Sequence, residues 1–189
     1  MLSDKPKLQN DNPRLTTMWN SPPNGWIKGN FDGAAKGNPG SAGCGGVLRD
    51  HMGNVIDAIA IPIGWTNSHI AEATAALYTM RIAVDLGCPN LWLEGDSLNI
   101  VNILNNKSST SWTIETTIKE IKHLIQNFEK IVITHTFREA NRVADWIANY
   151  AVLKGKMVRW TDDLINHVDL KAIIHYEAIH AQVGKICED

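Results

Sequence analysis

The chain has 189 residues, of which 44% are hydrophobic, and a formal charge of −2 at neutral pH. This length and apolar content suffice for one domain with a hydrophobic core. The near-neutral charge excludes nucleic-acid binding through overall basicity, so such binding would have to rest on local basic residues or bound metal. Three cysteines without metal-ligand spacing predict reduced thiols and an intracellular protein, with nucleus or cytoplasm left open. No apolar run is long enough for a membrane span.

The beginning of the chain predicts a polar lead-in followed by a folded domain. Residues 1–24 are rich in Asn and Pro, which favours disorder, with Trp19 as a candidate anchor on the domain. The domain is expected over residues 25–155. Its first part contains three segments that are typical of strands, and the short turns between them predict an antiparallel meander of residues 26–31, 43–49 and 54–63.

The rest of the domain predicts helices alternating with two buried strands. Helical periodicity begins at Ile70 and stops at residues 87–89, Gly-Cys-Pro. The strand 91–93 then precedes a helix capped by Asp96 or Ser97. The remaining elements are a helix near 114–125, a strand at 130–135 and a helix from 143 to 151. Because crossover helices make the strands that they join parallel, we expect an α/β fold with a five-stranded mixed sheet flanked by helices.

Residues 156–189 predict a C-terminal helical extension, with its helix over Thr161–Val183. The apolar face of this helix is imperfect, and it suits packing on the domain or on a partner. We expect a monomer in which this helix is the candidate contact surface.

Four carboxylates lie where predicted strands end or predicted helices begin, namely Asp32, Glu72, Asp96 and Asp145. Asp32 and Asp96 follow strands whose carboxyl ends share one edge of the sheet. Clustered acids raise each other's pKa, and Mg²⁺ relieves this repulsion because it binds carboxylates together with water and phosphate oxygens. The pattern predicts metal-assisted attack on a phosphodiester. Taken singly, Asp32 also suits a turn, Asp96 a helix cap and Asp145 a first helical turn.

Short motifs occur in order between Trp19 and Leu153. They are Trp-x-x-Pro-Pro-x-Gly-Trp-x-Lys-x-Asn, Asp-Gly-Ala, Gly-Asn-Pro-Gly, Gly-Gly-Val-Leu-Arg-Asp, Ala-Glu-Ala, Asp-Ser and His-x-x-Arg-Glu-x-Asn-x-x-Ala-Asp. With them the chain resembles the ribonuclease H domain, particularly the plant type related to retrotransposon reverse transcriptases. No single fragment is specific for this family, but the complete series of motifs in this order is.

The resemblance implies a ribonuclease H-like fold and an endonuclease that cleaves the RNA strand of RNA–DNA hybrids with two Mg²⁺ ions, for which Mn²⁺ can substitute. It makes Asp32, Glu72, Asp96 and Asp145 metal ligands, with His135 as a further catalytic residue. It also assigns hybrid contacts to a set of small residues, Gly37, Asn38, Thr66, Asn67 and Ser68. The basic helical handle of the bacterial type is missing, since Asp96 and His135 lie only 39 positions apart.

Three other functions remain open. The first is a catalytically weak or silent nucleic-acid-binding domain domesticated from a retrotransposon. The second is a 3′-end exonuclease, which also uses four acids on a related sheet. The third is a structural role based on the C-terminal helix. Lys28 and Arg49 are expected to meet phosphates or to remain solvated surface charges.

Overall fold

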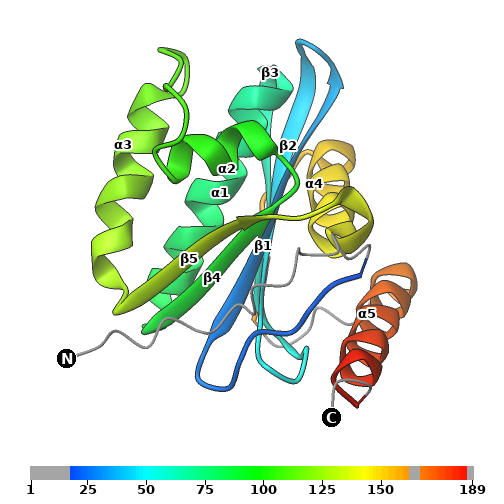
Figure 1. Ribbon diagram of the computed structural model, residues 1–189. Helices are drawn as coiled ribbons and strands as arrows, with labels where there is room; N and C mark the ends of the chain where they lie inside the picture. The colour runs from blue at the N-terminus through cyan, green and yellow to red at the C-terminus, as the bar shows by residue number, and fades with distance from the viewer. Residues whose placement is uncertain (1–17, 162–166, 187–189) are drawn as a thin grey trace, which may run out of the picture.

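The computed structural model describes residues 18–161 and 167–186. Most of the predicted lead-in, the residues 162–166 at the start of the predicted C-terminal helix, and Cys187 lie outside the described residues. The centre of the fold is one sheet of β1 (Ile27–Gly37), β2 (Gly40–Arg49), β3 (Val55–Thr66), β4 (Asn90–Gly95), β5 (Lys130–His135) and β6 (Val158–Trp160). The strand order is β5-β4-β1-β2-β3-β6 (Figure 1). β1, β2 and β3 pair antiparallel, while β4 and β5 run parallel to β1, which confirms the predicted mixed sheet.

Two details of the sheet differ from prediction. β6 is a sixth strand, and it escaped prediction because three residues are too few to reveal a period. It pairs antiparallel with β3, and Arg159 on β6 lies 2.7 Å from the fully buried carboxylate of Asp57. The prediction also ends the first strand at Phe31. The strand instead continues to Gly37 because it pairs with β2 along that whole length, so Asp32 lies inside β1 rather than after it.

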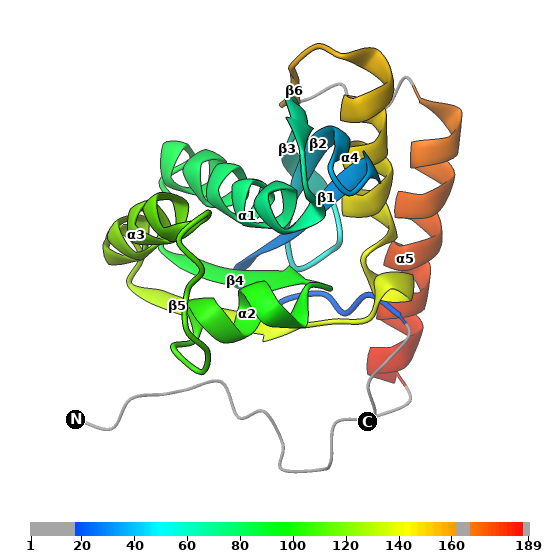
Figure 2. The same ribbon diagram turned by 90° about the horizontal axis from the view of Figure 1, so that it is seen from above.

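Helices cover both faces of the sheet (Figure 2). One face carries α1 (Ser68–Asp85), α2 (Leu98–Leu104) and α3 (Glu115–Leu124), and the other carries α4 (Arg142–Lys154) and α5 (Val168–Ile186). The short 3₁₀ helices η1 (Ile125–Asn127) and η2 (Arg138–Ala140) flank β5. The predicted helices are present, although α5 begins at Val168 instead of Thr161. None of the helices that the structure describes is long and apolar enough to cross a bilayer.

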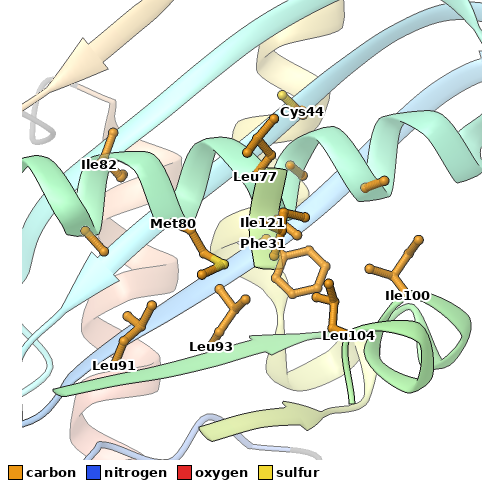
Figure 3. Packing of buried hydrophobic residues seen from close by; sticks show 14 of the residues in the cluster. Phe31, Cys44, Leu77, Met80, Ile82, Leu91, Leu93, Ile100, Leu104 and Ile121 are labelled. Carbon is orange, nitrogen blue, oxygen red and sulfur yellow. The ribbon is translucent and has the colours of Figure 1, made fainter. Parts of the chain in front are cut away.

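The main hydrophobic core lies between α1–α3 and the sheet. Figure 3 shows Met80 of α1 close to Leu91 and Leu93 of β4, with Phe31 of β1 beside them. A second core lies under α4, where Val47 of β2 packs against the helix. Burying this apolar surface is the main favourable contribution to folding, and it fixes the positions of the strand ends at which the acids lie.

Two glycines let helices approach the sheet closely. A Cβ atom on Gly33 of β1 would lie 2.3 Å from the backbone nitrogen of Glu72, so only glycine allows α1 to lie this close to the strand. A Cβ on Gly45 of β2 would lie 2.5 Å from the backbone nitrogen of Ala148 on α4. Steric space therefore explains why glycine follows Asp32: the absence of a side chain at Gly33 lets the start of α1 lie against the Asp32 carboxylate.

A buried polar network lies on the sheet face opposite α1, and it corrects the expectation that Lys28 and Arg49 are solvated or phosphate-binding. Both side chains are only 1% exposed. Lys28 Nζ lies 2.7 Å from Glu94 Oε1, and the side-chain oxygen Oδ1 of Asn30 accepts hydrogen bonds from both Trp19 Nε1 and Arg49 Nη2 at 2.9 Å. Burial lowers the pKa of Lys28, and the neighbouring Glu94 carboxylate offsets part of that effect.

This network ties α5 and the chain before β1 to the sheet. Arg49 Nη1 lies 2.5 Å from the buried Glu177 carboxylate of α5, and its guanidinium stacks 3.9 Å from the ring centroid of Trp19. Trp19 is 1% exposed. A buried charge whose partner is removed carries a large desolvation cost, so these contacts hold α5 and residue 19 in place.

We expect Glu177→Ala to lower the free energy of unfolding by about 3 kcal/mol or more, because it leaves the Arg49 charge buried without its carboxylate. The matched control is Glu120→Ala, which breaks the half-exposed ion pair with Arg81 and should cost about 1 kcal/mol or less. Urea unfolding measures both. Equal losses in the two variants would mean that α5 does not depend on the buried ion pair.

Candidate active site

Strand pairing places two of the predicted acids side by side. In the parallel pair β1–β4, Phe31 is opposite Gly95, so Asp32 and Asp96 each come one residue after that pair. Asp32 lies within β1 and is 5% exposed, whereas Asp96 directly follows β4 and is half-buried. The parallel arrangement of β1 and β4 therefore brings these two carboxylates to one place on the sheet.

Glu72 reaches the same place from α1. It lies in the second turn of the helix rather than in the first, as the sequence had suggested, and the close approach at Gly33 sets it against β1. One carboxylate oxygen from each of Asp32, Glu72 and Asp96 lies within 4.8 Å of the others. They line a hollow of about 270 Å³ that Ser68 also borders.

Asp145 lines this hollow too, but it is not part of the tight group of three. It lies in the first turn of α4, whose start is fixed by the buried Asn141, which donates a hydrogen bond to the Phe31 carbonyl at 2.9 Å. Asp145 Oδ1 accepts a hydrogen bond of 2.7 Å from Arg138 Nη2. The Arg138 side chain is 73% exposed, and such a surface ion pair contributes only about 0–1 kcal/mol. Little free energy is therefore needed to release Asp145.

Burial and, next, the neighbouring negative charges raise the pKa values of the two most buried acids, Asp32 and Glu72. Burial and, next, the charges of Glu72, Asp96 and Asp145 raise the pKa of Asp32 well above its ordinary value. Burial and the Asp96 charge raise the pKa of Glu72 to about 8, although a hydrogen bond from the Gly33 backbone opposes this shift. The hollow is therefore unfavourable for three ionised carboxylates unless a positive charge joins them.

The donor set of the hollow fits a hard divalent cation. Among the described residues, the charged side chains that line the hollow are four carboxylates and Arg138. Carboxylate oxygens are the ligands that Mg²⁺ and Mn²⁺ prefer. The buried Glu72 Oε2 has no hydrogen-bond partner in the part of the chain that the structure describes. An unpaired buried carboxylate oxygen is costly, and cation binding would satisfy it.

His135 lies beside the acids. It is the last residue of β5 and pairs with Gly95, and its Nε2 lies 3.1 Å from the Asp96 carbonyl oxygen. Its half-buried ring also packs edge-on against Phe137. The histidine is thus held against the backbone of Asp96, one of the three acids, although it does not itself line the hollow.

The five small residues expected to contact a hybrid lie together next to the hollow. Gly37 and Asn38 form the β1–β2 turn, and the Asn38 side-chain oxygen Oδ1 accepts a hydrogen bond from the Ser68 backbone N–H at 3.1 Å. Thr66 pairs with Gly40 across β2 and β3, and Asn67 caps α1 by accepting a hydrogen bond from the Ile70 backbone. The turn and the start of α1 therefore form one continuous polar surface that reaches the acids through Ser68.

Two residues of this region were missed by the sequence reasoning. Asn141 positions α4 through its contact with β1, and Asn149 lines the hollow one turn after Asp145. Asn149 Nδ2 also donates to the Asp145 backbone carbonyl at 2.9 Å. The spacing of four residues from Asp145 was a usable signal for Asn149, because residues at i and i+4 share a helix face. Asn141 belongs to the motif that begins at His135, but its contact was not predicted because its partner Phe31 lies 110 positions away.

With the fold and this geometry in hand, comparison with known proteins assigns the family. The model of the reverse transcriptase-like family matches residues 30–151. Ribonuclease H1 of the archaeon Halobacterium salinarum, as a solved structure, superimposes with a TM-score of 0.65 at 30% identity over 68% of this chain and 98% of that one. The chain belongs to the reverse transcriptase-like ribonuclease H family.

Two further relatives support this membership of the ribonuclease H family. An Arabidopsis thaliana protein provisionally named a ribonuclease H protein is 39% identical over 141 residues, which are 74% of this chain and 23% of that protein. The chain thus spans about a quarter of the length of this relative. LC11-RNase H1, solved in complex with an RNA/DNA hybrid, has a TM-score of 0.64 and 28% identity over 68% of this chain and 98% of its own.

The raised pKa values predict a pH-dependent stability without metal. The folded protein holds the Glu72 proton up to about pH 8, whereas the unfolded chain releases it near 4.5. The free energy of unfolding should therefore fall as the pH rises between these values, and Asp32 should add to the effect. We expect a lower Tm in EDTA at about pH 8.5 than at about pH 5.5, and a larger Mg²⁺-induced rise in Tm at the higher pH.

Thermal unfolding of Glu72→Gln tests the cause. This variant should lose part of the pH dependence, while Glu129→Gln, an exposed control before β5, should keep it. A wild-type Tm that does not fall between the two pH values would contradict the electrostatic account of the acids.

Proposed function

We propose that the chain is an endonuclease that hydrolyses the RNA strand of RNA–DNA hybrids with two Mg²⁺ ions, for which Mn²⁺ can substitute. The observation that carries the proposal is the group of three carboxylates within 4.8 Å, in a chain of the ribonuclease H family. The hybrid-bound LC11-RNase H1 supports the choice of substrate, since it has the same fold at 28% identity.

Each acid has a proposed role. Asp32 would bridge the two ions from the central strand, Glu72 and Asp96 would hold one of them, and Asp145 the other. When bound, the ions supply a Lewis acid and an activated water for in-line displacement at the phosphodiester. Asp145 must leave Arg138 to take part, and the exposure of that ion pair makes the exchange inexpensive.

The other predicted residues position the substrate. His135, whose Nε2 lies 3.1 Å from the Asp96 carbonyl oxygen, would exchange a proton with water or product. The polar surface of Gly37, Asn38, Thr66, Asn67 and Ser68 would contact the two backbones. Discrimination of RNA from DNA then rests on the 2′-hydroxyl, so no preference for base sequence is expected.

Asp32→Asn tests the proposal most simply. The substitution removes a carboxylate that would bind both ions, and it should reduce the rate of hybrid cleavage at least about a thousandfold. Metal ions stabilise the charge of the transition state by several kcal/mol, and each 1.36 kcal/mol changes the rate tenfold. Gel analysis of a labelled hybrid in Mg²⁺ measures the rate. Asp169→Asn, an exposed acid on α5, is the matched control and should cleave at the wild-type rate. Near wild-type cleavage by Asp32→Asn would refute the assignment.

A second candidate is a nucleic-acid-binding domain that has lost turnover. The engagement of Asp145 by Arg138 favours it, because the fourth acid is then withheld from the other three. A gel shift with a labelled hybrid in Ca²⁺, followed by addition of Mg²⁺, separates the two functions. Binding followed by cutting supports the nuclease, whereas binding without cutting supports the silent domain.

A further inference from the structure

A second and larger hollow lies beside the acids, between the start of α4 and α5. Its volume is about 590 Å³, and Trp19, Arg142, Tyr176 and His180 are among the residues that line it. Arg138 and Asp145 line both this hollow and the acid hollow, so the two adjoin. Tyr176 and His180 lie outside the residues that the family model matches. The volume is within the range of ordinary ligand sites.

The wall formed by α5 presents two aromatic rings in tilted contact. Tyr176 and His180 are one turn apart, with ring centroids 4.1 Å from each other and planes at 33°. The Tyr176 side chain is 49% exposed, so its ring is accessible from the hollow. Arg142 on α4 faces this pair, with its guanidinium 5.7 Å from the Tyr176 ring centroid. Aromatic rings beside a guanidinium are the chemistry that binds an unpaired nucleotide.

The charges of the hollow also favour a phosphate. Among the described residues Arg142 has no ion-pair partner. Of the acids that line the hollow, Glu177 is neutralised by Arg49 and Asp145 by Arg138, which leaves the exposed Glu139. Under the proposed function, a cation that bound Asp145 would compete with Arg138 for this carboxylate. The Arg138 guanidinium, which lines both hollows, would then be available to a phosphate in the second one.

We propose that this second hollow binds one unpaired nucleotide of a nucleic acid held at the acids. Arg138 and Arg142 contact its phosphate, and the Tyr176–His180 pair stacks on its base. The inference rests on the proposed function, because it requires nucleic acid at the acid hollow. A base inside a duplex is already stacked between its neighbours, so the preferred substrate class is a hybrid that continues into a single-stranded tail.

The test is binding of fluorescein-labelled hybrids in Ca²⁺, measured by anisotropy with the full chain. One hybrid is blunt, one carries an RNA tail and one a DNA tail. The wild-type chain should bind a tailed hybrid at least about fivefold more tightly than the blunt one, as expected for stacking of one base. Tyr176→Ala should abolish this preference and leave blunt binding unchanged, whereas Tyr176→Phe, which keeps the ring, should retain it.

Salt dependence gives an independent readout for the guanidinium. Arg142→Gln should reduce the slope of log affinity against log salt for the tailed hybrid by about 0.7–0.9, the value for one phosphate contact. Lys171→Gln, the same loss of charge at an exposed position of α5 away from the hollow, should leave the slope unchanged. The control for the loss of side-chain volume in Tyr176→Ala is Ile179→Ala, at another exposed position of α5, which should keep the preference for the tailed hybrid.

The outcomes separate the two proposals. If the wild-type chain binds and cuts the blunt hybrid but shows no preference for either tail, or if Tyr176→Ala keeps the preference, the nucleotide site is refuted and the nuclease remains. If the wild-type chain neither binds nor cuts any hybrid, the proposed function itself fails.

Discussion

Three carboxylates that share one small hollow are the constraint on which the rest of this structure depends. Their burial and, next, their mutual repulsion raise the pKa values of Asp32 and Glu72, so the arrangement is unfavourable at neutral pH without a compensating charge. The fold nevertheless imposes it. Parallel pairing of β1 with β4 fixes Asp32 beside Asp96, and the missing side chain at Gly33 brings the start of α1 close enough for Glu72 to join them. Clustered carboxylates that destabilise the empty hollow are typical of a cation site, because a bound cation removes their repulsion and this gain in free energy contributes to its binding.

The fourth acid is held differently, and the difference links two parts of the surface. Asn141 anchors the beginning of α4 to β1, which places Asp145 at the hollow, while the Asp145 carboxylate pairs with the exposed Arg138 and lies outside the group of three. The same ion pair borders the second hollow, whose other wall is α5. α5 is held there by the buried contact of Glu177 with Arg49, on the sheet face opposite α1. The helix beyond the family match is thus fixed in position by the core of the domain, and its Tyr176 and His180 rings line the second hollow.

Much of this could be predicted from sequence because the relevant signals are local. Alternating and helical periodicities give the strands and helices, and the rule for crossover connections makes β4 parallel to β1, from which the meeting of Asp32 and Asp96 follows. Signals that depend on distant partners were not available. Lys28 and Arg49 look like ordinary surface charges, and their partners Glu94 and Glu177 are 66 and 128 positions away (94 − 28 and 177 − 49). β6 is too short to show a period, and no local pattern indicates that Arg138 engages Asp145. Most of the unpredicted features are long-range contacts, whereas the three clustered acids themselves were predicted.

The central claim is that Asp32, Glu72 and Asp96 together bind a divalent cation. The most direct measurement is anomalous diffraction at the manganese absorption edge from crystals of the full chain grown with Mn²⁺. The account predicts an anomalous peak between these three carboxylates, within about 2.0–2.3 Å of their oxygens. Crystals with ordered side chains at all three acids and no anomalous peak between them, at saturating Mn²⁺, would contradict it.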